Sequence, residues 1–259
     1  MTASSHQATI VDQFTRQAVP FSTAPGIKDE EALALLVTES GAGADDTVLD
    51  VACGPGLVVA AFARVVRHAT GIDITPAMLA RADELARSRG LTNVRWDRGD
   101  VTPLPYADGS FSIVSSRFAF HHFLDPAAVV AEMRRVCVPG GTIVVTDLVA
   151  SPDPAKAAAL NAMERLCDPS HVRALPLAEL EALLLDAGLS LRRRAGYQLA
   201  SDLEGLLERS FPAPGGTDRI RALFAASLAA DGLGLATRRH GERDIRFAYP
   251  VAILVAGAP

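Results

Sequence analysis

Cysteine is scarce in this sequence of 259 residues, which contains only Cys53, Cys137 and Cys167. The three cysteines are widely spaced, odd in number and without a C-x-x-C pair. Such spacing provides neither a disulfide framework nor the paired ligands of a structural zinc site. We therefore expect a protein of a reducing compartment.

A basic excess and a long apolar run are also missing. The chain has 25 Lys and Arg against 30 Asp and Glu, a formal net charge of −5, and a nucleic-acid-binding face would need a basic surface. The first residues, MTASSHQATI, lack the basic head and apolar core of a signal peptide. The final run VAILVAGA has strand length, far below the ~20 residues of a membrane span. These features predict a cytoplasmic protein with no nucleic-acid partner and no membrane span.

The most informative stretch that is present is TVLDVACGPG, at residues 47–56. An apolar run ends in Asp50 and leads directly into a tight glycine turn. Residues 57–66, LVVAAFARVV, are then typical of a buried helix. A strand, an acid, a glycine turn and a helix form the first unit of a nucleotide-type α/β fold, in which the backbone passes close to a ligand.

The glycine turn does not complete the dinucleotide fingerprint G-x-G-x-x-G. Gly54 and Gly56 supply two of its glycines, but the third position is Val59. That fingerprint serves a pyrophosphate on bare backbone amides, and Asp50 at the mouth of the loop would repel it. The turn therefore favours a positively charged nucleoside without phosphate. It counts against the alternative of an NAD-dependent oxidoreductase.

Acidic residues also end the next two expected strands. The run ATGIDI, at residues 69–74, reaches Asp73 17 positions after Gly56. An acid about 20 residues beyond such a loop can accept hydrogen bonds from both ribose hydroxyls. The third expected strand, residues 93–100, ends in Asp100. Three successive strands that each end in an acid predict one nucleoside site.

With these residues the sequence resembles the class I S-adenosylmethionine-dependent methyltransferases, whose first motif is D/E-x-G-x-G-x-G. Asp50, Gly54 and Gly56 match this motif, and Ala52 stands at its first glycine. The resemblance is strong over residues 27–150 and is to the broad group that contains ubiquinone, menaquinone and small-molecule methyltransferases.

The resemblance implies S-adenosyl-L-methionine as cofactor and a Rossmann-like α/β fold, with a seven-stranded, mostly parallel sheet and helices on both faces. It also implies that Asp100 binds the adenine amino group and that the Val101 amide lies on the ring. Arg117 is expected either to pair with the methionine carboxylate or a substrate acid, or to form a structural ion pair with a strand-end acid. The full expected cofactor site is Asp50, Ala52, Gly54, Gly56, Asp73, Ile74, Met78, Asp100, Val101 and Arg117.

We expect a single methyltransferase domain, residues 1–259, whose cofactor-binding core is residues 27–150. Ligands of open α/β sheets lie over the carboxyl ends of the strands, so segments outside this core are candidates for a lid over the substrate. The first such segment has a short expected helix that ends before Pro20. The three segments are residues 1–26, 151–176 and 201–234.

His121 and His122 follow the fourth expected strand, residues 111–120, where the methyl acceptor should arrive. A histidine there can take a proton from a phenol, hydroxyl or enolisable carbon at neutral pH. The structural alternative is that one histidine caps the following helix and the other packs on the cofactor. Adjacent residues of a strand point to opposite faces, which favours His121 as the base. The same geometry, without H-x-H or H-x-x-x-H spacing, argues against a metal site.

Phenylalanines near the expected site favour a lipophilic or aromatic acceptor; they are Phe14, Phe21, Phe118, Phe120 and Phe123. The sequence thus predicts a methyltransferase that acts on a small, fairly apolar or aromatic molecule. A second interpretation stays open, a protein that binds the cofactor without methyl transfer, such as a cyclase, a decarboxylase or a binding module. Its cofactor site would look the same.

Overall fold

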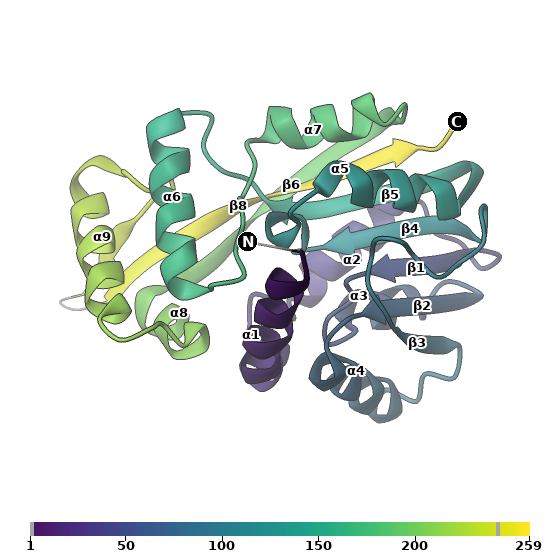
Figure 1. Cartoon of the computed structure of the whole chain (residues 1–259), viewed down its shortest axis with the longest axis horizontal. Coiled ribbons are helices and arrows are strands. Elements are labelled where there is room, and N and C mark those ends of the chain that lie inside the picture. The colour runs from purple at the N-terminus through teal and green to yellow at the C-terminus, as the bar shows by residue number, and fades with distance from the viewer. Residues whose placement is uncertain (1–2, 242–243) are drawn as a thin grey trace.

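The computed structural model describes residues 3–241 and 244–259, so residues 1 and 2 of the expected N-terminal segment lie outside the described residues. Its centre is an eight-stranded sheet with the order β3-β2-β1-β4-β5-β8-β6, and β7 pairs with β8 (Figure 1). β1 to β5 are parallel, and β8 lies antiparallel between β5 and β6. The strands are β1 Thr47–Val51, β2 His68–Asp73, β3 Val94–Arg98, β4 Phe111–Arg117, β5 Cys137–Leu148, β6 Ser190–Asp202, β7 Arg238–His240 and β8 Asp244–Gly257.

This sheet confirms the expected Rossmann-like, mostly parallel α/β fold. The difference in strand number is β7, an exposed strand of three residues beside β8 that the sequence analysis does not include. The central strand β1 is apolar almost throughout, and its Val48, Leu49 and Val51 have no exposed surface. A parallel sheet covered by helices on both faces needs such continuous apolar strands.

Helices cover both faces of this sheet (Figure 1). α5 and α7 pack on one face, and α2 and α3 pack on the other, in two separate apolar clusters. Among the described residues, no helix combines the length and the apolar character that a membrane crossing requires. The helices are α1 Ala3–Thr23, α2 Glu30–Ser40, α3 Leu57–Phe62, α4 Pro76–Ser88, α5 Pro126–Val136, α6 Pro154–Cys167, α7 Leu177–Asp186, α8 Leu203–Ser210 and α9 Gly216–Ala230, with the short 3-10 helix η1 Phe120–His122.

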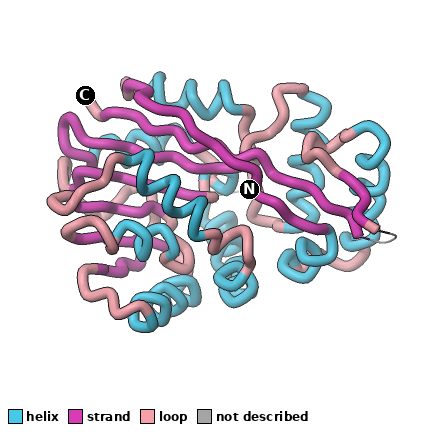
Figure 2. Tube along the Cα trace, turned by 180° about the vertical axis from the view of Figure 1, so that it is seen from behind, coloured by secondary structure: helices cyan, strands magenta, loops and turns pink. Residues whose placement is uncertain are grey.

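The two long strands β6 and β8 carry a second group of helices. They have 13 and 14 residues and run beyond the parallel strands to the end of the molecule where α6, α8 and α9 lie (Figures 1 and 2). There Phe224 of α9 packs on Phe247 of β8 in a third apolar cluster, with ring centroids 4.6 Å apart. The segments predicted outside the core, residues 151–176 and 201–234, supply these three helices.

The N-terminal helix is longer than the sequence predicts. α1 has 21 residues and contains Pro20, and it contacts both α4 and α8 (Figure 1). The carbonyl of Pro20 accepts from the Ala24 N–H at 3.0 Å, and the Thr23 hydroxyl donates to the Val19 carbonyl at 3.0 Å. These bonds close the last turn, so the predicted helix end before Pro20 is wrong.

The helix after the glycine turn is shorter than predicted. α3 ends at Phe62, whereas the apolar pattern continues to Val66. The side chain of Asn93 donates to the carbonyls of Ala63 and Val66 at 2.9 and 3.1 Å. Asn93 therefore satisfies carbonyls at the helix end and holds residues 63–66 as a turn.

Candidate functional site

The turn between β1 and α3 has left-handed backbone at three positions. Gly54 and Gly56 have φ values of +51° and +77°, and Ala52 has +56°. An alanine thus adopts the conformation that glycine takes more readily at the first position of the motif. A Cβ on Gly56 would lie 2.6 Å from Cη2 of Trp96, whereas a Cβ on Gly54 would meet no atom within 4 Å. Packing therefore requires glycine at position 56, while Gly54 faces open space.

That open space belongs to a cavity lined by the ends of β1, β2 and β4 and by α1. Its empty volume is about 920 Å³ with the open mouth included, at the upper end of the ~300–1,000 Å³ typical of small-molecule sites. Of the predicted cofactor residues, Gly56 does not line it. The other nine do: Asp50, Ala52, Gly54, Asp73, Ile74, Met78, Asp100, Val101 and Arg117.

Two of the strand-end acids in this first cavity are held by backbone amides. Asp73 accepts from the Gly54 and Thr75 N–H groups, both at 2.8 Å. Asp100 accepts from the Val101 N–H at 2.7 Å and from the side-chain amide of Gln7 on α1. Burial raises the pKa of Asp73, and the two amide bonds oppose that rise. Both carboxylates are therefore fixed in direction before any ligand arrives.

Asp50 and Arg117 are two oppositely charged residues of the first cavity that each have an unsatisfied polar atom. Oδ1 of Asp50 and Nε of Arg117 are buried and have no hydrogen-bond partner among the described residues. Burial raises the pKa of Asp50 to about 8, although the positive charge of Arg117 opposes the rise. Arg117 donates to the Ile27 carbonyl and the Tyr197 hydroxyl at 2.9 and 3.2 Å. No described acid lies within ion-pair distance of it, so the structural ion pair considered from the sequence is absent.

These orphaned groups fit a ligand that carries both a cation and a carboxylate. A buried carboxyl without a partner costs free energy, and a cation beside it would favour its ionised form. An arginine with a free N–H can likewise receive a carboxylate. S-adenosylmethionine has both kinds of charge on its methionine part. The donor and acceptor set of the cavity therefore suits this cofactor.

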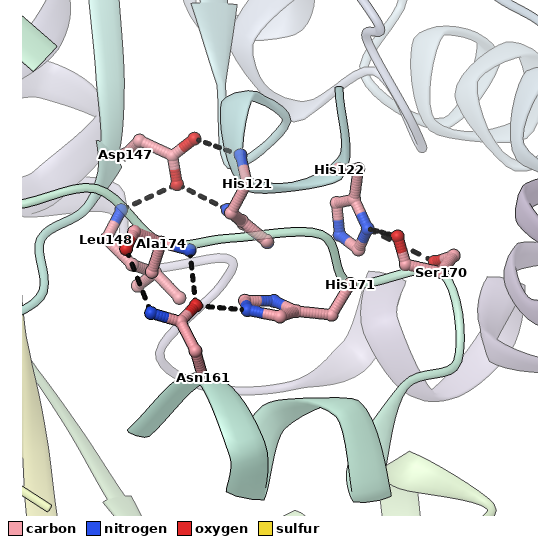
Figure 3. Close-up of polar contacts among 8 residues, drawn as sticks. All are labelled: His121, His122, Asp147, Leu148, Asn161, Ser170, His171 and Ala174. Atoms are coloured by element: carbon pink, nitrogen blue, oxygen red, sulfur yellow. Dashed lines mark hydrogen bonds and ion pairs between the residues drawn. The ribbon is translucent and has the colours of Figure 1, made fainter. Parts of the chain in front are cut away.

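His121 is held by Asp147, which lies at the end of β5. Nδ1 of His121 is 2.5 Å from Oδ1 of Asp147, and the other carboxylate oxygen accepts from the His121 backbone N–H at 3.2 Å (Figure 3). A carboxylate accepts, so Nδ1 carries the proton. Nε2 of His121 makes no hydrogen bond within the described part of the chain, and it is therefore the nitrogen available to a ligand.

Two further buried histidines surround His121, and neither has a carboxylate partner. Nδ1 of His122 lies 3.1 Å from both the carbonyl and the hydroxyl oxygen of Ser170. Nε2 of His171 lies 2.7 Å from the side-chain oxygen of Asn161 (Figure 3). The ring centroid of His121 is 4.3 Å from that of His122 and 5.5 Å from that of His171.

The pKa of one of these three rings is raised, whereas the pKa values of the other two are lowered. Burial by itself would lower the pKa of His121, but the Asp147 carboxylate raises it above its usual value. Burial and the neighbouring His121 lower the pKa of His122 to about 4. Burial and both neighbours lower the pKa of His171 even further. The cluster thus has one titratable member and two neutral ones.

The prediction that His121 and His122 point to opposite faces of a strand is wrong. It assumed a strand through residue 120, but β4 ends at Arg117 and Phe118 has a φ of +56°. The chain then turns into η1, where the strand alternation of side chains does not apply. His121 and His122 consequently lie side by side. Among the described residues, no His, Cys, Asp and Glu group has the arrangement of a metal site.

A second cavity lies next to the first, with an empty volume of about 1090 Å³. The two cavities share Phe21, Ile27, Phe118 and His122 as lining residues. His121 lines only the second cavity. The remaining walls come from α1, α6, α8, β6 and β8, and therefore mainly from the segments predicted outside the core.

Of the five phenylalanines singled out in the sequence, four line the first cavity: Phe14, Phe21, Phe118 and Phe123. Phe120 instead packs in the core cluster beneath α5. The sequence analysis missed Asp147 and, in the second cavity, Glu164 and Tyr249. Asp147 ends a parallel strand, the same signal that identified Asp50. Nothing in the sequence pattern marks the other two.

The chain is similar in sequence and in fold to known methyltransferases. Residues 49–145 match the model of a methyltransferase domain. The chain is 30% identical over 251 residues to the uncharacterized methyltransferase YcgJ of Bacillus subtilis, covering 94% of this chain and 96% of that protein. The crystal structure of YcgJ superposes with a TM-score of 0.80 at 27% identity, covering 88% of this chain and 97% of that one.

Two further similarities are more limited. The ubiquinone/menaquinone biosynthesis C-methyltransferase UbiE of Bdellovibrio bacteriovorus is 40% identical over 114 residues, covering 43% of this chain and 48% of that protein. Geranyl diphosphate C-methyltransferase of Streptomyces coelicolor, solved with Mg²⁺, geranyl diphosphate and S-adenosyl-L-homocysteine, has a TM-score of 0.63 at 16% identity. The match covers 88% of this chain and 78% of that chain. At that identity the likeness concerns the fold alone.

Proposed function

The chain belongs to the class I S-adenosylmethionine-dependent methyltransferases, and we propose that it transfers the methyl group to a small, fairly apolar or aromatic acceptor held in the second cavity. The main support is that the two cavities share Phe21, Ile27, Phe118 and His122 as lining residues. Asp50, Asp73 and Asp100 line only the first cavity, and His121 lines only the second. A cofactor in the first cavity and an acceptor in the second would come into contact beside these four residues. The outer segments, residues 1–26, 151–176 and 201–234, serve as the lid.

In this proposal the first cavity holds S-adenosylmethionine, the cofactor of these enzymes. Asp73 accepts from the ribose hydroxyls, and Asp100 accepts from the adenine amino group with Val101 beside the ring. Asp50 stabilises the cationic groups of the methionine part, and the free N–H of Arg117 receives its carboxylate. The support for these roles is that each residue lines the cavity with a fixed or orphaned polar atom.

When bound, S-adenosylmethionine supplies an electrophilic methyl group, whose bond to sulfur breaks with the electron pair staying on sulfur as the acceptor bonds the carbon. His121 accepts the proton of the acceptor hydroxyl at Nε2 and becomes imidazolium. Asp147 holds the ring in one tautomer and stabilises the positive charge that forms. The apolar residues shared by the two cavities exclude water and align the acceptor, which is the larger part of catalysis for an in-line displacement.

A direct assay of methyl transfer tests the proposed function. The protein is incubated with methyl-labelled S-adenosylmethionine and a library of small hydroxylated aromatic and aliphatic molecules, and products are identified by mass spectrometry. The proposal predicts a labelled methylated product together with an equal amount of S-adenosylhomocysteine. Tight cofactor binding without any labelled product would instead favour a protein that uses the cofactor only structurally.

A further inference from the structure

The second cavity has a polar feature that the transfer step does not use. Tyr249 of β8 donates to Oε1 of Glu164 on α6 at 2.6 Å. Oε2 of Glu164 makes no hydrogen bond within the described part of the chain, and Glu164 and Tyr249 both line the cavity. Burial raises the pKa of the Glu164 carboxyl, and no described cation forms an ion pair with it. This leaves one carboxyl oxygen for a bound molecule.

The other acids of the second cavity each bond a backbone N–H through Oδ1. Asp168 accepts from the backbone N–H and the hydroxyl of Ser170 at 2.7 and 2.6 Å. Asp202 caps α8 by accepting from the Gly205 N–H at 2.7 Å. Glu164 differs from them, because its one side-chain hydrogen bond among the described residues comes from the Tyr249 side chain and none comes from the backbone, so its second oxygen can accept from a bound molecule.

The charge of the lining residues excludes an anionic acceptor. Among the lining residues that the structure describes, Arg209 is the only Lys or Arg, and it stands against Glu164, Asp168 and Asp202. A phosphate or diphosphate needs several cationic donors, whereas carboxyl groups repel it. The acceptor that fits this lining is neutral.

Large apolar side chains make up much of the remaining lining of the second cavity, beside the polar Gln17, Ser201 and Ser210. Phe21, Phe118, Leu148, Leu199 and Leu206 form its walls. An aromatic ring packs well on phenylalanine rings, edge to face or offset. A flat apolar body with polar groups at its ends matches walls of this kind.

We propose that the acceptor is a neutral aromatic molecule with two oxygen groups, a hydroxyl presented to His121 and a second hydroxyl or carbonyl bonded to Glu164. This inference rests on the proposed function, because it assigns the second cavity to the acceptor. Glu164 and Tyr249 then determine specificity: they select for the second oxygen group without touching the reacting atom. An acceptor that lacks this group leaves Oε2 of Glu164 without a donor, while Oε1 keeps its bond from Tyr249.

Calorimetry on the full chain saturated with S-adenosylhomocysteine tests the inference without requiring turnover. The probes are the positional isomers of dihydroxynaphthalene, 2-naphthol and 2-naphthyl phosphate. We expect at least one diol to bind roughly tenfold tighter than 2-naphthol, the difference that one hydrogen bond makes, and the phosphate to bind least. Glu164→Leu should remove the preference for the diol, and Glu164→Gln should keep it because an amide still forms hydrogen bonds.

Glu208 provides the matched control, since it is an exposed acid of α8 outside the cavity, and Glu208→Gln should bind all three probes like the parent. Equal affinity for diols and 2-naphthol, tightest binding of the phosphate, or no naphthol binding at all would overturn the inference. So would a diol preference that survives Glu164→Leu. In each of these cases S-adenosylhomocysteine still binds. Failure to bind S-adenosylhomocysteine would overturn the proposed function together with the inference.

Discussion

Nδ1 of His121 lies 2.5 Å from the carboxylate of Asp147, and the same carboxylate accepts from the His121 backbone N–H. Two contacts from one acid fix both the position and the tautomer of the ring. A histidine held in this way presents Nε2 as its only free nitrogen, which is the requirement for a general base. The relationship joins the end of β5 to η1, and it sets His121 apart from the two neutral histidines beside it.

Replacement of His121 should strongly lower the rate of methyl transfer and leave the affinity for the cofactor almost unchanged. His121→Ala is expected to lower turnover of a hydroxyl acceptor by ~10²–10⁴-fold, the range for removal of a general base. Cofactor affinity should stay at the parental value, because His121 does not line the first cavity. His240→Ala, at an exposed position of β7, is the control. Near-parental turnover of His121→Ala would contradict the assignment.

Asp147 should act through the pKa of its histidine. Because the carboxylate raises the pKa of His121, Asp147→Asn should lower that pKa. The base form then persists to lower pH, so the acidic limb of the kcat/KM profile should move to lower pH while the maximum rate falls. A purely structural role would reduce the rate without moving the limb. An unmoved limb in a folded variant would therefore exclude the positioning role.

Variants of Asp100 test whether cofactor binding needs a negative charge at this position or only a hydrogen-bond acceptor. Asp100→Ala is expected to weaken cofactor binding by ~1.5–3 kcal/mol, as for a lost bond to a charged group. Asp100→Asn should lose less, because its amide oxygen can still accept from an adenine amino group. Asp45 is an exposed acid that does not line the first cavity, so Asp45→Ala should bind normally in the same calorimetric series. Parental affinity in both Asp100 variants would remove adenine from the end of β3.

Cofactor binding should release a proton from Asp50. Its pKa is about 8 in the free protein because it is buried, so the carboxyl is mostly protonated at pH 7. A cationic ligand favours the ionised form, and affinity should therefore rise with pH, by roughly tenfold per unit at most, and level off above pH 8. Titrations in buffers of different ionisation enthalpy measure the released proton. Asp50→Asn should remove the pH dependence; its persistence there would assign the proton to another group.

The first cavity could be predicted from the sequence because each of its acidic residues is identified by the few residues around it. Asp50 and Asp73 lie at the ends of β1 and β2, and Asp100 follows β3, which ends at Arg98 and not at Asp100 as predicted. The carboxyl ends of parallel strands meet at one edge of a sheet. The same signal is present at Asp147, but its pairing with His121 depends on the turn at Phe118, where a non-glycine residue takes a positive φ. No strand pattern predicts that turn.

The second cavity could not be predicted from the sequence, for a different reason. Glu164 and Tyr249 are 85 residues apart, and they meet because β8 extends past the parallel strands to reach α6. β6 and β8 are long because they continue to pair with each other beyond the end of β5. This pairing is a tertiary feature that no local pattern predicts. The sequence pattern located the outer segments, but it could not predict that they pack into a second cavity.

A crystal structure of the protein with S-adenosylhomocysteine tests the central claim most directly, since it shows where the nucleoside and the sulfur lie. The account predicts adenine within hydrogen-bond distance of Asp100, ribose at Asp73, and the sulfur beside the wall that contains Phe118 and His122. The sulfur should face the second cavity and His121. A nucleoside bound elsewhere, or a sulfur directed away from that wall, would contradict the account.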